Sequence, residues 1–140
     1  MEKPKYEELV DAIVTRDPRF HRDAYEFLRE ALEFAQRRLT RDKEEGERHV
    51  TGQQLLEAIR QYALQEFGPM ALTVLGAWGV TRCEDFGEIV FNLIDHQVLR
   101  KTDTDSRADF SGGYAFEEAF VDPFLPPSRM RARAAPAEAP

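Results

Sequence analysis

The chain has 140 residues, of which 42% are hydrophobic and 32% charged, and its formal net charge is −7. This composition is typical of one globular domain, and the single cysteine, Cys83, excludes an internal disulfide framework and a four-thiolate zinc site. The negative charge argues against nonspecific binding to nucleic acid or to an anionic membrane.

Two helices are predicted before residue 40, and a proline separates them. The first spans about residues 6–14, where apolar side chains recur at helical spacing with charges between them. Asp17 then precedes Pro18, and the residue before a proline is pushed away from helical backbone angles. A second helix is predicted over residues 22–39, with an apolar face formed by Tyr25, Leu28, Ala31, Leu32, Ala35 and Leu39. The charged residues 40–50 are expected to form a loop.

A third and a fourth helix are predicted on either side of a glycine–proline pair. Thr51 and Gln54 match a capping box, in which the two side chains satisfy free N–H groups at a helix start. The helix that follows carries apolar residues at Leu55, Leu56, Ile59, Tyr62, Ala63 and Phe67. Gly68 and Pro69 fit the end of that helix and the start of a short one over residues 69–78, which Gly79 ends.

The fifth predicted helix has two different faces. Thr81 and Glu84 match a second capping box at its start. Its apolar face consists of Phe86, Ile89, Val90, Leu93 and Ile94. Its polar side carries Glu84, Asp85, Glu88, Asn92 and Asp95.

The C-terminal part is predicted to contain a short β-ribbon and a tail. The strands fall at residues 98–100 and 114–116, around an acidic, turn-rich segment. The proline- and alanine-rich residues 121–140 are expected to be disordered. We therefore predict a mainly α single domain of about five helices over residues 1–120, whose residues 51–120 form a winged-helix-like part. The alternative is a plain five-helix domain with an irregular C-terminal arm.

The sequence favours a cytoplasmic location. The N-terminal residues lack the basic start and apolar run of a secretory signal. No apolar stretch approaches the roughly 20 residues that span a bilayer. We expect no membrane partner, and the pattern does not distinguish a monomer from a homodimer.

Several short runs together resemble a family of uncharacterised bacterial proteins of about this length. These runs lie between about Tyr6 and Phe120 and read DPRF, AYEFLREAL, HVTGQQLLEAIRQYAL, EFGPMALTVLGAWGV, EDFGEIVFNLI, DSRADF and YAFEEAF. The family has no assigned activity, substrate or cofactor. The resemblance therefore implies a self-contained bacterial domain and identifies no catalytic residue.

The polar side of the fifth helix is the predicted functional surface. A groove-binding helix usually offers Arg, Lys, Asn or Gln to DNA, whereas this one offers mainly carboxylates. Residues 81–120 contain nine acidic residues against four basic ones. We therefore predict a noncatalytic module that docks an unidentified protein partner, with nucleic-acid binding by a winged helix as the alternative. The predicted partner-binding residues are Glu84, Asp85, Glu88, Asn92 and Asp95.

A metal-dependent enzyme is a weaker alternative. Asp103, Asp105 and Asp109 offer oxygen ligands for a hard cation. The later glycine and glutamate of a calcium-binding loop are not at the required positions, so we expect solvated carboxylates and no bound metal or cofactor.

Two further features favour structure over catalysis. The triplet His21, Arg22 and Asp23 resembles the start of a kinase catalytic loop, but the required asparagine is missing and the chain is too short for that fold. We expect a helix start there. Cys83 lies in the first turn of a helix beside two acidic residues, which oppose thiolate formation, so we expect an inert thiol.

Overall fold

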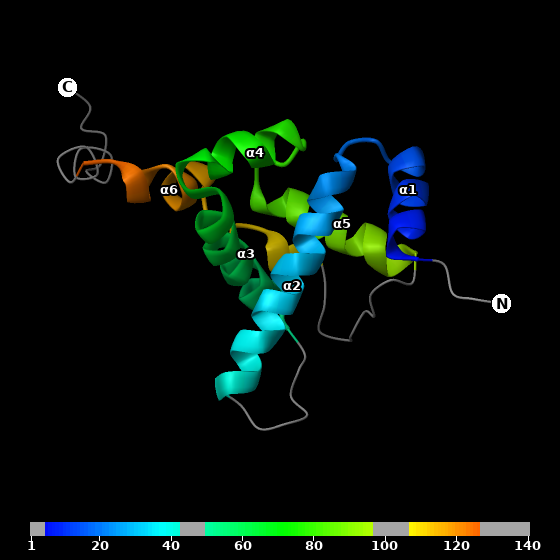
Figure 1. Ribbon diagram of the computed structural model, residues 1–140, viewed down its shortest axis with the longest axis horizontal. Coiled ribbons are helices and arrows are strands. Elements are labelled where there is room, and N and C mark those ends of the chain that lie inside the picture. Colours follow the sequence, from blue (N-terminus) through cyan, green and yellow to red (C-terminus); the bar gives the residue numbers. More distant parts are fainter. Residues whose placement is uncertain (1–4, 43–49, 97–106, 127–140) are drawn as a thin grey trace.

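The computed structural model describes residues 5–42, 50–96 and 107–126, and these residues are mainly helical (Figure 1). The α-helices are α1 Tyr6–Arg16, α2 Arg22–Asp42, α3 Gly52–Phe67, α4 Ala71–Ala77, α5 Cys83–Asp95 and α6 Phe116–Phe120. Three short 3-10 helices complete the described elements: η1 Gly68–Met70, η2 Arg107–Phe110 and η3 Asp122–Phe124. The prediction of a mainly α protein is confirmed.

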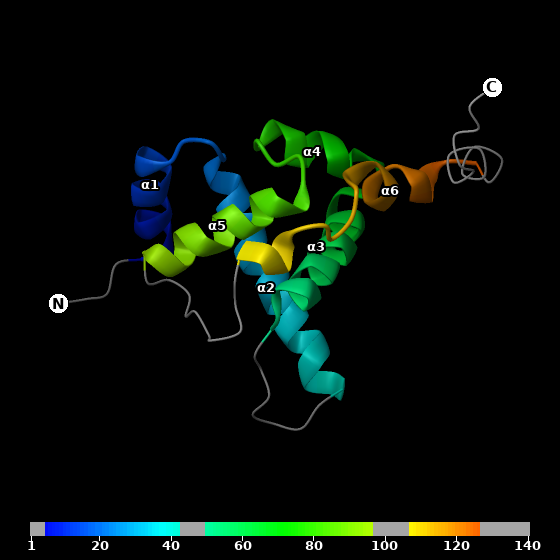
Figure 2. The ribbon, with the colours of Figure 1, turned by 180° about the vertical axis from the view of Figure 1, so that it is seen from behind.

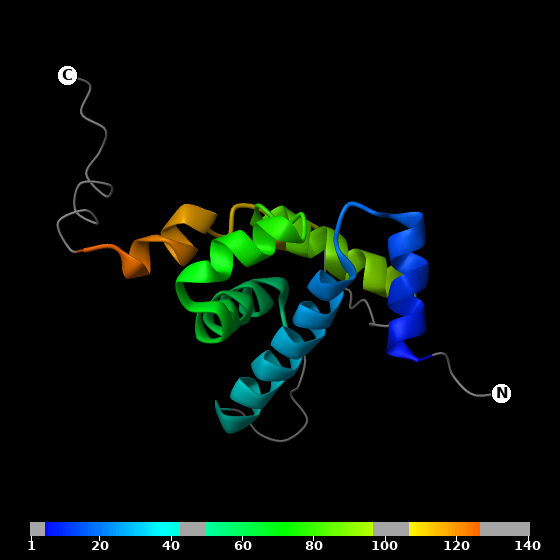
Figure 3. The ribbon, with the colours of Figure 1, turned by 45° about the horizontal axis from the view of Figure 1, so that its top comes forward.

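The helices α2 and α3 form an antiparallel pair that makes the most extensive contact between two elements. Seen from behind, α5 crosses the N-terminal half of α2 and reaches α1 (Figure 2). The helices α1 and α6 lie at opposite ends of the molecule, and α4 covers α3 and α5 on one side (Figure 3). The C-terminal half of α2 extends away from this body, past the start of α3.

Local signals account for the ends of α1 and α3. Asp17 adopts extended backbone angles and ends α1 immediately before Pro18. The capping box at α3 is confirmed: the Gln54 N–H donates to the Thr51 hydroxyl at 3.1 Å, and the Thr51 N–H donates to the Gln54 side chain at 2.9 Å. Gly68 ends α3 with a φ of 53°, in the region that glycine adopts most readily.

The predicted capping box at the start of α5 is wrong. Because α5 begins only at Cys83, the N-cap residue is Arg82 rather than Thr81. The side chain of Arg82 makes no capping hydrogen bond. The third helical position is therefore Asp85 rather than Glu84. The carboxylate of Asp85 accepts from the Thr81 N–H at 2.9 Å and from the Thr81 hydroxyl at 3.3 Å. Asp85 thus fixes the entry of the chain into α5.

The core is centred on α5, in which eight of 13 residues are buried. Its apolar face packs against every other long helix, and Phe86, Ile89 and Leu93 are almost fully buried. A second group of aromatic rings closes the opposite side of α2, where Phe27 lies within 5.7 Å of the ring centres of Tyr62, Phe67 and Trp78. Such close ring pairs stabilise a core beyond the area that they bury.

Residues 107–126, which we call the C-terminal arm, pack against this core and contain no β-strand. Tyr114 and Ala115 are not in a strand, and α6 begins at Phe116, so the predicted strand at residues 114–116 is wrong. The reason is the spacing of Phe116, Ala119 and Phe120, which places all three buried side chains on one face of a helix. The predicted strand at residues 98–100 lies outside the described residues.

The arm is held by close packing against α3 and α5. The ring of Phe110 packs against Gly52 and Gly87. A Cβ atom at either position would come within about 3.3 Å of that ring, so a larger residue there would leave the ring too little room. The Tyr114 hydroxyl donates to the Leu56 carbonyl at 2.9 Å. The helix η3 continues the ordered chain beyond residue 120, where the sequence predicted the disordered tail to begin. Residues 127–140 of that predicted tail lie outside the described part.

Candidate functional site

The five predicted docking residues of α5 lie in different environments. Asp95 is exposed, Glu84, Asp85 and Glu88 are half-buried, and Asn92 is buried with 8% of its surface exposed. The Asp85 carboxylate already accepts two hydrogen bonds from Thr81. The five residues therefore do not form one continuous exposed face.

Asn92 connects three elements inside the protein. Its amide donates to the Asp17 carboxylate at 3.0 Å and to the Tyr25 hydroxyl at 3.0 Å. These bonds join α5 to α2 and to the connection between α1 and α2. A buried amide with partners of this kind stabilises the interior. Asn92 is therefore engaged inside the protein, and its predicted docking role stays a prediction that this burial disfavours.

The connection between α1 and α2 faces the same side of α5. Arg19 donates to the two carboxylate oxygens of Asp17 at 2.8 and 2.6 Å. This pairing with Arg19, helped by Asn92, holds the pKa of Asp17 well below its usual value. Glu88 contributes to the raised pKa of Arg19 and therefore lies near its positive charge. Glu88, in the middle of the predicted acidic face, therefore has a basic side chain of the protein itself in its surroundings.

No metal-binding group of three His, Cys, Asp or Glu side chains is present within residues 5–42, 50–96 and 107–126. Asp103 and Asp105 fall outside these ranges, and Asp109 lies half-buried in η2. The proposed cation ligands are therefore not brought together by the part of the chain that the structure describes.

Cys83 is buried, and its thiol lies 3.4 Å from the Tyr114 carbonyl, to which it donates. Burial raises the pKa of this thiol, and nearby Glu84 raises it further. Since the thiolate is the nucleophile, we expect Cys83 to react slowly with a disulfide reagent in the native protein and rapidly after unfolding in urea. An equal rate in the two states, measured by release of the coloured thiol, would contradict the inert role.

His21 closes the start of α2. Its Nδ1 accepts from the Asp23 N–H at 3.0 Å, and its backbone N–H donates to the Trp78 carbonyl at 3.0 Å. Asp23 lies in the first turn, where a negative charge favours the helix dipole. The helix start predicted for this triplet is confirmed.

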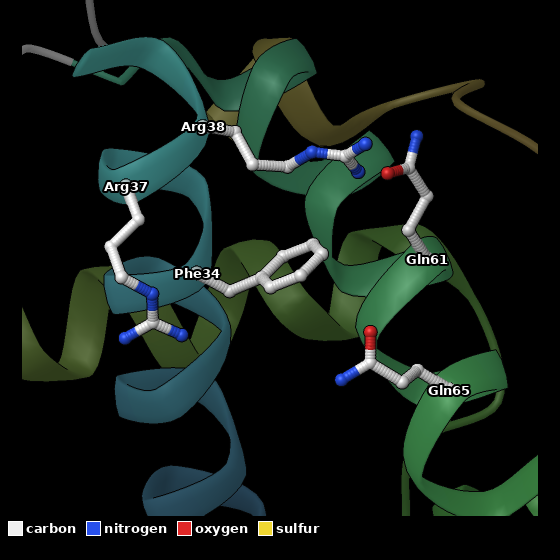
Figure 4. A pocket seen from close by; sticks show the side chains of 5 residues that line it. All are labelled: Phe34, Arg37, Arg38, Gln61 and Gln65. Carbon is white, nitrogen blue, oxygen red and sulfur yellow. The ribbon is translucent and has the colours of Figure 1, made fainter. Parts of the chain in front are cut away.

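A pocket of about 390 Å³ lies between α2 and α3 (Figure 4). We call it the α2–α3 pocket, and its lining residues are Phe34, Arg37, Arg38, Gln61 and Gln65. The first three belong to α2 and the two glutamines to α3. Its volume falls in the range of small ligand sites, but its lining is mostly polar and positively charged.

Phe34 lines the α2–α3 pocket and contacts side chains from both helices. Its ring lies 5.4 Å from that of Tyr62 on one side, and the Arg38 guanidinium lies 5.1 Å from its centre. Tyr62 is fixed in turn, because its hydroxyl donates to Glu30 at 2.8 Å. Burial, followed by this contact with Glu30, raises the pKa of Tyr62 to about 12. The phenol therefore remains a neutral donor at physiological pH.

The two arginines of the α2–α3 pocket differ from their neighbours on the same helices. Arg29 is paired with Glu26 and Glu33, and Arg60 is paired with Glu57. Arg37 and Arg38 are exposed and form no salt bridge with any residue that the structure describes. Within the described residues, both guanidinium groups are therefore without a salt-bridge partner, on a chain that is acidic overall.

The α2–α3 pocket was not among the sites predicted from the sequence. A signal was present, because Phe34 lies outside the main apolar face of its helix and two consecutive arginines follow one turn later. An aromatic residue one turn before a cation on an exposed helix face favours stacking between them.

The comparisons with known proteins add no identification. The chain matches no family model, no curated protein and no solved structure. The resemblance to a bacterial family thus stays a prediction. Within the described residues, none of the helices has the length and apolar character needed to cross a membrane.

Proposed function

We propose that the protein is a noncatalytic, cytoplasmic protein-interaction module that docks its partner at the α2–α3 pocket. The observation that carries this proposal is the exposed pair Arg37 and Arg38 beside the fixed ring of Phe34. Arginine and aromatic side chains contribute most of the binding energy at many protein interfaces. The pocket is also open to a partner without any rearrangement of the core.

The acidic side of α5 is the weaker docking surface. Asp85 and Asn92 are engaged within the protein, and Glu88 lies near the positive charge of Arg19. Long-range attraction by a few separated carboxylates speeds an encounter more than it stabilises a complex. We assign the acidic residues of α5 at most a steering role.

The alternative function is nucleic-acid binding by a winged helix. In that alternative, α3, α4, α5 and the C-terminal arm form the winged-helix-like unit that the sequence predicts. In a nucleic-acid-binding winged helix, α5 would enter the major groove. A recognition helix needs a free face with donors, whereas α5 buries eight of 13 residues and exposes carboxylates. The observations therefore favour the interaction module.

The test compares two charge reversals in the tagged full chain. We expect Arg37→Glu with Arg38→Glu to abolish capture of a stoichiometric protein partner from the native extract, because the proposed anchors are inverted. We expect Glu84→Lys with Glu88→Lys to leave capture within about twofold, because these two side chains lie outside the proposed docking pocket and separated charges contribute more to the rate of encounter than to affinity. Both variants should unfold near the wild-type temperature, since all four side chains are exposed or half-buried.

The extract is divided into nuclease-treated and untreated halves, and bound proteins are identified by mass. A partner that survives nuclease and depends on Arg37 and Arg38 supports the proposal. Loss of capture only in the Glu84 and Glu88 variant would contradict docking at the pocket and favour docking at the acidic side of α5. Nucleic acid in the untreated half, with proteins lost on nuclease treatment, would favour the winged-helix alternative.

A further inference from the structure

We propose that the α2–α3 pocket recognises an acidic peptide segment of the partner, with carboxylate side chains received by Arg37 and Arg38. This inference rests on the proposed function and adds the chemistry of the ligand. Arg38 reaches from α2 toward Gln61 on α3, and Arg37 lies on the other side of the Phe34 side chain (Figure 4).

The stacking on Phe34 prepares Arg38 for a carboxylate. A guanidinium that lies over an aromatic ring keeps its N–H edges free, and those edges match the two oxygens of a carboxylate. The ring also restricts the side chain before binding, so that less rotamer entropy is lost in the complex. The ring itself is held against the core, through Tyr62 and its bond to Glu30.

The two glutamines add neutral donors on the opposite wall. Gln65 extends from α3 toward Phe34 and makes no hydrogen bond with any residue in the described ranges. The amide nitrogen of Gln61 already donates to Glu57 at 3.0 Å. Gln65 is therefore the side chain on α3 that can donate to a peptide carbonyl or to a second carboxylate.

The surroundings of the pocket favour a peptide over a nucleic acid. Carboxylates lie on both helices that form the pocket, at Glu30, Glu33, Glu57 and Glu66. A polyphosphate chain carries a charge at every nucleotide and would meet these carboxylates as well as the arginines. A peptide places its few carboxylates at chosen positions and leaves neutral residues opposite the glutamates. The alternation of charge around the pocket thus selects an anion with separated charges.

The test uses an array of labelled peptides in which two glutamates are placed at all short spacings in a neutral helical background. A matched array carries glutamine in place of glutamate, and a single-stranded oligonucleotide provides the polyanion probe. Binding to the full chain is followed by fluorescence anisotropy at low and at physiological salt. The side-chain amide signals of Gln61 and Gln65 in NMR spectra report whether the pocket is occupied.

We expect a subset of the glutamate peptides to bind, with matched glutamine peptides at least about tenfold weaker. Arg37→Gln with Arg38→Gln should remove this preference, and Arg37→Lys with Arg38→Lys should retain only part of it because lysine cannot bind a carboxylate at two points. The control variant, Arg16→Gln with Arg82→Gln, removes two exposed charges elsewhere and should bind as the wild type does.

Equal binding of the glutamate and glutamine arrays would overturn the inference, as would equal losses in the pocket variant and in the control variant. Preferential binding of the oligonucleotide would overturn it too. The inference and the proposed function can fail separately. If capture of the partner depends on Arg37 and Arg38 but no acidic peptide binds, the inference is wrong and the proposed function stands. If capture does not depend on Arg37 and Arg38, the proposed function is wrong.

Discussion

Replacement of Gly79 by alanine is expected to destabilise the fold by about 3 kcal/mol, which combines the strain of a positive φ with a steric clash. Gly79 ends the segment after α4 with a φ of 88°. A Cβ atom there would lie only 2.4 Å from the Arg19 carbonyl oxygen. That oxygen belongs to backbone, so the clash is not relieved by rotation of a flexible side chain.

The close approach at Gly79 holds two distant connections together. The His21 N–H donates to the Trp78 carbonyl at 3.0 Å, which fixes the start of α2 against the end of α4. The Val80 N–H donates to the Leu75 carbonyl at 2.9 Å and fixes the exit of the chain toward α5. Movement of either segment to admit a methyl group would break one of these bonds.

Gly76 provides the matched control, three residues earlier in α4. An added Cβ there meets nothing within 4 Å, and its φ is not in the positive region. Gly76→Ala should therefore stabilise the protein by roughly 0.5–1 kcal/mol, because alanine is the better helix former. Urea unfolding followed by circular dichroism measures both variants, and a Gly79→Ala protein as stable as wild type would refute the assigned contact.

Local sequence signals predicted the elements that depend on neighbouring residues. The break at Asp17 and Pro18, the capping box at Thr51 and the helix end at Gly68 all involve residues within one turn of each other. Their physical causes are proline sterics, capping bonds and glycine backbone freedom, and none of them needs tertiary structure. These predictions were confirmed for that reason.

The wrong predictions have a different cause in each place. At residues 114–116, β-forming aromatic residues suggested a strand, but the spacing that continues to Ala119 and Phe120 is helical. At α5, the helix begins one residue later than the motif of Thr81 and Glu84 predicts, so the carboxylate that bonds Thr81 belongs to Asp85. In both places the residues that follow the short motif determine the structure.

The candidate site depended on long-range partners that no local pattern contains. Asn92 lies on the polar side of its helix, and its burial results from Asp17 and Tyr25, which are 75 and 67 residues away. The α2–α3 pocket exists only because α2 packs antiparallel to α3 and brings Phe34 beside Tyr62. Charge patterning along one helix contains neither of these long-range contacts.

The interaction of Asp17 with Arg19 and Asn92 makes the stability of the protein dependent on pH. Hydrogen bonds from Arg19, then from Asn92, hold the pKa of Asp17 below its ordinary value of 3.8. The folded state therefore binds this proton less readily than the unfolded state does. By linkage, the ionised carboxylate stabilises the fold at pH values above 3.8, and this contribution is lost progressively as the pH falls below that value.

We expect Asp17→Asn to destabilise the protein by about 1–2 kcal/mol at pH 7, because it removes a charge-assisted pair whose carboxylate is mostly covered. The amide introduced by this substitution can still accept from Asn92, so the loss belongs to the charge rather than to the shape. The difference in unfolding free energy between variant and wild type should shrink as the pH is lowered from about 7 toward about 3 and below.

The control is Asp11→Asn, which removes an exposed carboxylate that lies 3.4 Å from Arg22. An exposed pair of this kind contributes at most about 1 kcal/mol, so the variant should remain close to wild type across the same range. Urea denaturation at each pH gives both comparisons. If the Asp17→Asn difference stays constant over the whole acidic range, its cause is lost packing at the α1–α2 connection, and the proposed coupling of α5 to that connection through an ionised carboxylate is wrong.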